Sequence, residues 1–156
     1  MKIALGADHR GSAAAMQLAE RLKKSGHDVQ ILRACSGEVC DYPDQASAVA
    51  KAVAQGASAG GADVGVLLCG TGIGMAIAAN KVPGARAAVV HDELTAQISR
   101  SHNNANIVCL SADLLGQRLI EQIVEVWLRT PFDGGRHERR VAKIAIIESG
   151  RDPAGA

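Results

Sequence analysis

The chain has 156 residues, 47% of them hydrophobic, which is enough for one domain with a buried core and too little for two. Its 17 basic residues nearly balance 16 acidic residues, for a formal net charge of +1 at pH 7. Such a chain offers no broad basic surface for nucleic acid or anionic membrane, so any anion is expected to bind at a local site. We therefore predict a single domain over residues 1–156, with no nucleic-acid partner and no membrane partner.

The N-terminal stretch MKIALGADHRG becomes polar at Asp8, too early for the apolar core of a signal peptide. No apolar run approaches the roughly 20 residues of a membrane span, so we expect a cytoplasmic protein. The four cysteines, Cys35, Cys40, Cys69 and Cys109, form no Cys-x-x-Cys pair, which argues against a disulfide framework or a zinc site. The roles of Cys35 and Cys40 stay open.

Short β-rich runs alternate with Ala- and Leu-rich helical patterns along the chain. The five strand–helix pairs are 2–6 with 12–26, 27–32 with 43–56, 62–69 with 72–82, 85–90 with 92–103, and 106–110 with 113–130. Continuous apolar strands that are each followed by a helix indicate a parallel sheet covered on both faces. The pattern therefore predicts a three-layer α/β/α Rossmann-like sandwich around a five-stranded parallel sheet.

Several residues mark the ends and the faces of these helices. Gly26 closes the first helix, and Pro43 lies near the first turn of the second. A further amphipathic helix begins near His137, beyond what the sheet needs, and is a candidate for packing on a partner subunit. Residues 150–156 are expected to form a flexible tail. An apolar stripe predicts the buried face of the long fifth helix: Leu115, Leu119, Ile120, Ile123, Val124, Trp127 and Leu128.

Ligands of open parallel sheets bind at the carboxyl ends of the strands, near the point where the strand order reverses. The polar residues at those ends are therefore the first candidates for a site. The loops supply Asp8 and His9 after the first strand, Asp41 and Tyr42 before the second helix, and Cys69 and Thr71 after the third strand.

Glycines at 70, 72 and 74 let the backbone turn sharply and present several N–H groups, which suits an anion or a developing oxyanion. A dinucleotide site is the alternative. Its fingerprint needs G-x-G-x-x-G, normally in the first strand–helix unit with an acidic residue after the next strand. Here the spacing is G-x-G-x-G in the third unit, so the match is poor even though Asp92 follows the fourth strand.

Cys69 has two interpretations. At the end of a buried strand it can be a small inert hydrophobe, whereas beside loop amides a thiol loses its proton more readily and becomes a usable base or nucleophile. His9 alone is more typical of a structural histidine, and its neighbour Asp8 improves the functional interpretation.

His102 and Asn103 lie between the fourth helix and the fifth strand. A crossover helix of about 11 residues spans roughly 16 Å, so His102 should not reach Cys69 of its own subunit. It either serves a neighbouring subunit or caps its helix. Arg136 and Arg140 are four residues apart and could hold a phosphate between them, or they could form a solvated basic face.

These motifs together resemble the ribose 5-phosphate isomerase B family, which includes galactose and allose phosphate isomerases. The resemblance covers nearly the whole chain in order, through KIALGADHRG, DYPD, CGTGIGMAIAANK, SHNNAN and PFDGGRHERRV. It implies an aldose–ketose isomerase that converts D-ribose 5-phosphate to D-ribulose 5-phosphate in the non-oxidative pentose phosphate pathway. It also implies a homodimer or larger assembly, such as a tetramer, with no metal and no nucleotide cofactor.

The resemblance also assigns roles by position. Cys69 would move the proton between C1 and C2 through a cis-enediolate, with Thr71 hydrogen-bonding near the thiol. His102 would open the furanose ring from the adjacent subunit, and Asp8 would assist. The remaining matches would bind substrate: His9, Tyr42, Gly70, Gly72, Ile73, Gly74, Asn103, Arg136 and Arg140. The subunit that supplies each arginine stays open.

One position departs from the family pattern. Asp113 stands where many relatives have an arginine that helps to bind substrate, and an acid cannot hold phosphate. Either the other basic groups suffice, or Asp113 points elsewhere, or the preferred sugar phosphate differs. An isomerase of allose 6-phosphate or galactose 6-phosphate therefore stays an alternative, as does a phosphosugar-binding module without catalytic activity.

Overall fold

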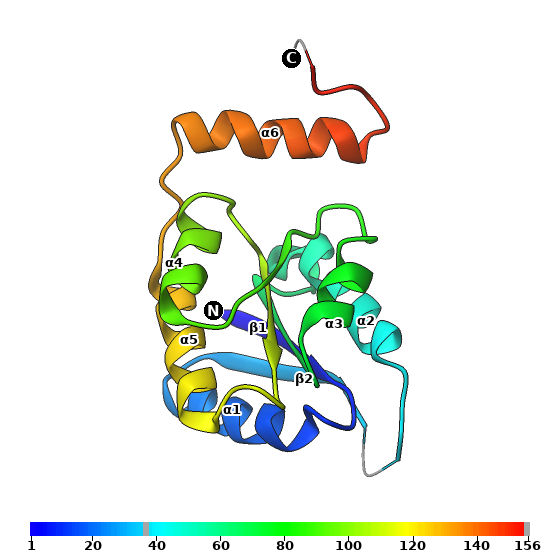
Figure 1. Cartoon of the computed structure of the whole chain (residues 1–156), viewed down its shortest axis with the longest axis vertical. Helices are drawn as coiled ribbons and strands as arrows, with labels where there is room; N and C mark the ends of the chain where they lie inside the picture. Colours follow the sequence, from blue (N-terminus) through cyan, green and yellow to red (C-terminus); the bar gives the residue numbers. More distant parts are fainter. Residues whose placement is uncertain (36–37, 155–156) are drawn as a thin grey trace.

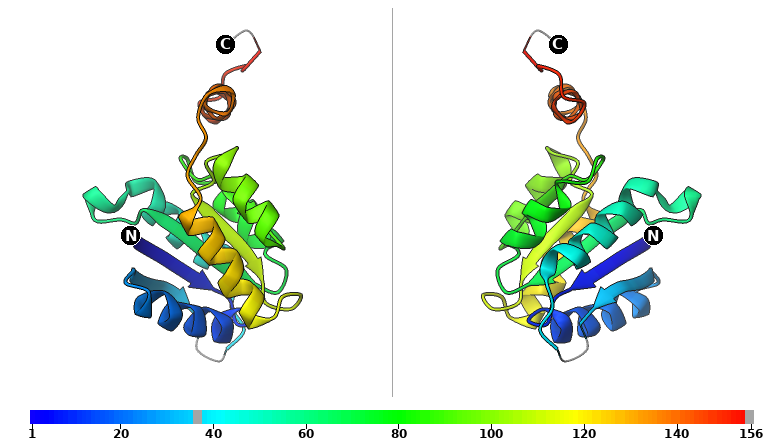
Figure 2. Two further views of the ribbon diagram at one scale, coloured as in Figure 1. Left: turned by 90° about the vertical axis from the view of Figure 1, so that its left-hand side faces the viewer. Right: turned by 90° about the vertical axis from the view of Figure 1, so that its right-hand side faces the viewer.

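The computed structural model describes residues 1–35 and 38–154 and confirms the predicted three-layer sandwich. A five-stranded parallel sheet in the order β2-β1-β3-β5-β4 lies between two layers of helices (Figures 1 and 2). The strands are β1 (Lys2–Ala7), β2 (Asp28–Ala34), β3 (Val64–Cys69), β4 (Ala87–Val89) and β5 (Ile107–Ser111). The helices are α1 (Ser12–Lys24), α2 (Tyr42–Gln55), α3 (Ile73–Ala79), α4 (Glu93–Ser101), α5 (Gln117–Arg129) and α6 (Arg136–Glu148), with a short 3₁₀ turn η1 (Ala57–Ala59).

The sheet has one apolar core on each face. All six residues of β3 are buried, and they alternate between the two cores because successive side chains of a strand point to opposite faces. Val66 and Leu68 pack in the core beneath α1, α4 and α5, whereas Leu67 and Cys69 pack in the core beneath α2 and α3. The Cys69 side chain is therefore on the α2–α3 face of the sheet.

The strand order reverses between β1 and β3. From β1 the chain first adds β2 on one side and then returns to add β3 on the other. The ends of the two strands are tied together, because Asp8 N donates a hydrogen bond to Leu68 O at 3.2 Å. A reversal of this kind opens the crevice in which ligands of such sheets bind, and Asp8 and Cys69 stand at its two sides.

Most of the predicted helix ends lie within two residues of the observed ends. Gly26 follows α1 with a φ of +86°, and Pro43 lies in the first turn of α2. The stripe on α5 is buried as expected at Ile120, Ile123, Val124 and Trp127, but Leu115 lies before the helix begins and packs on the core from the preceding loop.

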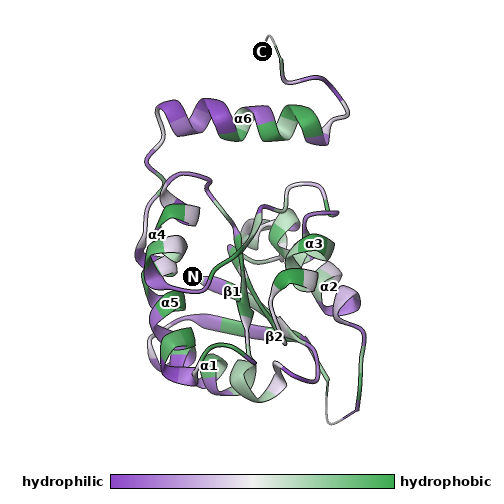
Figure 3. Ribbon diagram, in the orientation of Figure 1, coloured by the Kyte–Doolittle hydropathy of each residue, from purple (hydrophilic) through white to green (hydrophobic). Residues whose placement is uncertain are grey.

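Helix α6 stands away from the body of the domain (Figures 1 and 2). It begins at Arg136, one residue before the predicted start, after a turn in which Gly134 and Gly135 have φ values of +66° and +55°. Its first half is hydrophilic and its second half more apolar (Figure 3), with Ile144 and Ile147 exposed by 42% and 58%. The helix thus presents apolar side chains that the rest of the described chain leaves uncovered.

The segment after α6 has no regular secondary structure over residues 150–154, and Lys143 Nζ donates to Pro153 O at 2.8 Å. Residues 155 and 156 of the predicted tail lie outside the described residues. Among the helices of residues 1–35 and 38–154, none combines the length and the apolar character needed to cross a bilayer.

Cys35 and Cys40 form a disulfide in the loop between β2 and α2, with their Cα atoms 6.3 Å apart. The sequence analysis argues against a disulfide framework and leaves the roles of these two cysteines open, so this single local bridge is a finding of the structure. The search for Cys-x-x-Cys spacing could not find a local bridge between residues five apart. Cys69 and Cys109 are free and buried.

Candidate functional site

Cys69 lies at the carboxyl end of β3 with its sulfur facing the first turn of the glycine loop. Its Sγ accepts a hydrogen bond from Gly72 N at 3.1 Å. Gly72 has a φ of +77°, and a Cβ there would lie 3.1–3.2 Å from backbone atoms of Cys109 and Leu110. Only glycine fits this turn without strain, and the turn aims an amide at the sulfur.

The other free thiol, Cys109, is fully buried in the neighbouring strand. Burial, reinforced by the nearby Cys69, raises the pKa of the Cys109 thiol far above its ordinary value. Cys109 therefore remains a neutral thiol, and it provides an internal comparison for Cys69 in experiments.

The Thr71 hydroxyl accepts a hydrogen bond from Ile73 N at 3.3 Å. The sequence predicts that this hydroxyl acts near the thiol, whereas the structure gives it a partner within the loop and brings Gly72 N to the sulfur. Thr71 and the 53%-exposed Ile73 both face solvent beside the thiol, where a ligand would lie.

Tyr42, the first residue of α2, covers the end of the same loop. A Cβ on Gly74 would lie 2.7 Å from two carbon atoms of the Tyr42 ring, so the ring packs directly on the glycine backbone. Tyr42 is 42% exposed. It thus lies beside the glycine loop with part of its side chain open to solvent.

Asp8 and His9 follow β1 on the opposite side of the crevice. Asp8 is only 6% exposed, and its Oδ1 accepts hydrogen bonds from Arg10 N at 2.9 Å and Gly11 N at 3.0 Å. One carboxylate oxygen therefore shapes the loop. His9 is exposed, and its Nδ1 accepts a long 3.5 Å hydrogen bond from Cys40 N, so the disulfide loop helps to orient this ring.

Arg10 and Asp113 form an ion pair above Gly70. Arg10 Nε donates to Asp113 Oδ1 at 3.0 Å and to Oδ2 at 2.8 Å, and Nη2 lies 2.8 Å from Oδ2. The carboxylate raises the pKa of Arg10, first through the hydrogen bond and then through its charge. The sequence analysis does not single out Arg10, although the residue lies inside the GADHRG motif.

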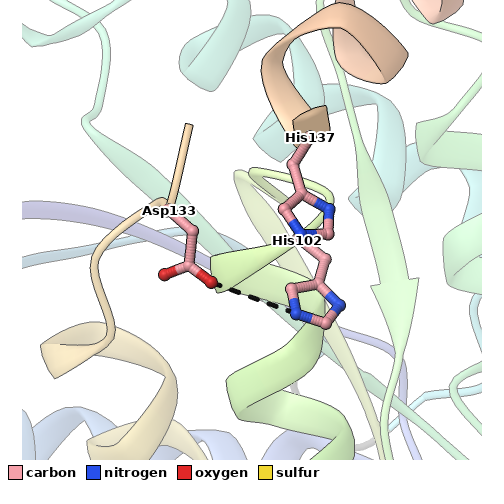
Figure 4. A group of neighbouring side chains, drawn as sticks. All are labelled: His102, Asp133 and His137. Carbon is pink, nitrogen blue, oxygen red and sulfur yellow. Dashed lines mark ion pairs between the residues drawn. The ribbon is translucent and has the colours of Figure 1, made fainter. Parts of the chain in front are cut away.

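A second cluster forms where α4 ends. The His102 ring is stacked on the His137 ring, with centroids 4.1 Å apart and an interplanar angle of 7°. Figure 4 shows the two rings beside Asp133. His102 Nε2 lies 4.0 Å from Asp133 Oδ2, and Asp133 N donates to Ser101 O at 3.0 Å. The sequence analysis misses Asp133 and His137 as partners of His102, although both lie in the PFDGGRHERRV motif.

The first turn of α6 adds positive charge to this cluster. Arg136 Nε donates to His137 Nε2 at 3.2 Å, and Arg140 follows one turn later; both arginines are exposed. Burial lowers the pKa of His137, and the neighbouring His102, Arg136 and Arg140 lower it further. Asn103 lies nearby and lines a cavity of about 260 Å³ that also contacts α6.

The donor atoms of His102, Asp133 and His137 lie within 4.8 Å of one another. A metal ion needs donors that converge on one point. Here the two imidazole rings are stacked almost parallel, and His137 Nε2 already accepts a hydrogen bond from Arg136. This geometry suits a polar cluster around His102 better than a metal site.

The structure brings the predicted site residues together in two groups at opposite edges of the sheet. Cys69 pairs with Ser111 at the carboxyl end of β5, whereas His102 precedes Ile107 at the amino end. Four residue steps of about 3.3 Å separate Ile107 from Ser111, so within one chain the two groups lie at opposite ends of a strand about 13 Å long. The first group contains Asp8, His9, Tyr42, Cys69, Gly70, Thr71, Gly72, Ile73 and Gly74, and the second contains His102, Asn103, Arg136 and Arg140.

Comparison with known proteins identifies relatives along nearly the whole chain. The family model for Ribose/Galactose Isomerase matches residues 3–144. Ribose-5-phosphate isomerase B of Escherichia coli is 42% identical over 151 residues, which cover 97% of this chain and 99% of the relative.

Solved structures agree with this match. The ribose-5-phosphate isomerase B of Clostridium thermocellum gives a TM-score of 0.91 at 45% identity and covers 96% of this chain and 99% of its own. The enzyme of Mycoplasma genitalium with bound ribulose-5-phosphate gives a TM-score of 0.84 at 38% identity, with coverage of 95% and 96%.

Proposed function

The chain belongs to the ribose/galactose isomerase family, and we propose on this basis that it interconverts D-ribose 5-phosphate and D-ribulose 5-phosphate. Relatives at about this level of identity include ribose-5-phosphate isomerases, one of which holds ribulose-5-phosphate, and a D-erythrulose-4-phosphate isomerase. The observation that carries the proposal is the position of Cys69, a free thiol that accepts an amide N–H at the crevice where the strand order reverses.

The proposed reaction is a proton transfer between neighbouring carbon atoms. After the ring opens, the Cys69 thiolate removes the proton from C2, and the electron pair moves into the C1 carbonyl to give a cis-enediolate. The thiol then returns the proton to C1 while the hydroxyl proton on O2 moves to O1, leaving a ketone at C2. The base and the amide donors supply this chemistry without a metal or a nucleotide cofactor.

The glycine loop is the proposed cradle of the enediolate oxygen. Gly72 N and Ile73 N already donate to Cys69 Sγ and to Thr71 Oγ1, so the proposed donors to the oxygen are the other backbone amides between Gly70 and Gly74. A single donor of this kind can stabilise a transition state by roughly 3 kcal/mol. Asp8, His9 and Tyr42 border the same crevice and are the proposed contacts to the sugar. Phosphate binding would supply energy for orientation away from the reacting carbons.

We propose that the working unit is a homodimer in which His102 and Asn103 of one subunit complete the site around Cys69 of the other. The separation of the two groups within a chain supports this arrangement. Helix α6 supports it too, because it stands off the body with Ile144 and Ile147 uncovered and carries Arg136 and Arg140. A tetramer of such dimers is compatible with the same site. Since phosphate esters do not cross membranes freely, we also propose that the enzyme works in the cytoplasm.

The test is the rate of ribose 5-phosphate isomerisation by chelator-treated protein, with ribulose 5-phosphate detected directly. Wild type is compared with Cys69→Ala and with Cys109→Ala, which removes the fully buried thiol as a matched control. We expect activity to survive chelation and the control substitution, and to collapse in Cys69→Ala. Full activity in Cys69→Ala would overturn the proposed base.

Asp113 favours one second candidate, an isomerase of a six-carbon sugar phosphate such as allose 6-phosphate or galactose 6-phosphate. Asp113 stands beside the glycine loop in place of the arginine of the family pattern, so the groups that a substrate meets there differ from that pattern. Values of kcat/KM for the three substrates separate the candidates, because the ratio of these values measures discrimination.

A further inference from the structure

Arg10 and Asp113 come from the loops after β1 and β5 and meet across the end of β3, which lies between these strands. Both are anchored by their backbones, since Arg10 N donates to Asp8 Oδ1 and Asp113 N donates to Gly70 O. A Cβ on Gly70 would lie 2.8 Å from Asp113 Oδ2 and 3.1 Å from Arg10 Nε. The ion pair thus rests directly on the first residue of the glycine loop, one residue from Cys69.

The pair leaves much of the guanidinium free. Its side chains are 56% and 35% exposed, so it is a surface ion pair, a type that contributes little to folding stability. A guanidinium has five N–H groups, and the contacts to Asp113 involve only Nε and Nη2. Nη1 and the second N–H of Nη2 can donate to a ligand while Asp113 holds the fork in place.

We propose that Arg10 binds the phosphate group of the sugar phosphate and that Asp113 is a positioning residue that fixes the Arg10 guanidinium beside Gly70. Asp113 cannot hold a phosphate itself, and in this structure its carboxylate instead holds a group that can. Planar guanidinium groups suit phosphate oxygens because two N–H groups can donate in parallel. The assignment rests on the proposed function for its substrate, and it makes Arg10 part of the same subunit's site as Cys69.

The experiment measures binding by calorimetry in a Cys69→Ala parent, which does not turn over its ligand. Ribose 5-phosphate and ribose are titrated into the parent, into an added Arg10→Met, and into an added Arg21→Met, a matched change on the exposed far end of α1. We expect Arg10→Met to weaken ribose 5-phosphate binding by about 10- to 100-fold, the size of a lost hydrogen bond to a charged group. The affinity for ribose, and the affinity of the Arg21→Met protein for both ligands, should not change.

Asp113→Asn tests the positioning role. It should weaken ribose 5-phosphate binding when Arg10 is present and should not weaken it further when Arg10 is Met. An unchanged affinity in Arg10→Met, or an equal loss for ribose, would overturn the assignment.

Activity of the wild type separates the two proposals. If ribose 5-phosphate binding depends on Arg10 but the wild type does not isomerise it, the proposed isomerase activity is refuted and the phosphate contact is supported. If the wild type isomerises ribose 5-phosphate but binding does not depend on Arg10, the activity is supported and the phosphate contact is refuted.

Discussion

The site is predicted to require two subunits, and this can be tested by mixing two inactive variants. Cys69→Ala and His102→Ala each remove one group from every site of their own homodimer. Within one chain the two groups lie at opposite ends of β5, because Cys69 pairs with Ser111 while His102 lies before Ile107. The length of that strand, about 13 Å, is several times a hydrogen-bond length, so we expect that Cys69 and His102 of one subunit do not act on the same sugar.

The expected recovery follows from the symmetry of a dimer. Random exchange of equal amounts gives half mixed dimers, and each mixed dimer has one site with both Cys69 and His102 and one site with neither. Activity should therefore rise from near zero to about a quarter of the wild-type value. A site built within one subunit would leave both sites of a mixed dimer defective, and no activity would return.

The assay needs proof that subunits exchange. Two affinity tags, one on each variant, allow the mixed dimer to be isolated and its isomerase rate to be measured per site. The control mixes Cys69→Ala with a differently tagged Cys69→Ala, for which no recovery is expected. Absence of activity in isolated, folded mixed dimers would refute the argument that His102 acts across the interface.

Two further predictions concern the loop and the histidine cluster. Gly72→Ala should lower kcat by about 10- to 100-fold, because a Cβ at its φ of +77° and against the Cys109 and Leu110 backbone would shift the amide that donates to Cys69. The control is Gly26→Ala, at a φ of +86° in open space, which should lower stability and leave kcat unchanged. Equal kcat values in the two variants would contradict the role of the loop. For His137, burial and neighbouring positive charges hold the pKa in the folded state below its unfolded value near 6.5. The neutral imidazole therefore contributes stability that is present above the unfolded pKa and is lost as pH falls through the folded pKa. The Tm of wild type should drop more steeply below about pH 6.5 than that of His137→Gln, and parallel curves would contradict this reasoning.

The sandwich could be predicted from the sequence because its signals are local. Continuous apolar runs such as β3 specify strands buried on both faces, and Gly26 and Pro43 mark helix ends through backbone preferences that do not depend on distant residues. The position of Cys69 at a strand end followed from the same pattern. The partner of its sulfur did not, because the choice between the Thr71 hydroxyl and the Gly72 amide depends on the dihedral angles of one turn.

Contacts between distant segments could not be predicted. The stacking of His102 on His137 depends on how the segment before α6 returns past the end of α4, which no periodicity records. The Cys35–Cys40 bridge joins residues five apart in the sequence, a spacing without a Cys-x-x-Cys signal. Its effect reaches the site, since Cys40 N donates to His9 Nδ1 and so orients a proposed sugar contact.

Asp113 shows why a site cannot be judged one position at a time. Considered alone, an acid beside the glycine loop removes a phosphate contact and adds repulsion toward the substrate. In the folded chain it is paired with Arg10, from 103 residues away, and the pair carries no net charge while the guanidinium keeps free N–H groups. The charge that a substrate meets is therefore set by the pair and by which partner offers donors to the crevice. A departure at one position can thus preserve the chemistry of the site when a second residue places the same functional group there from another strand.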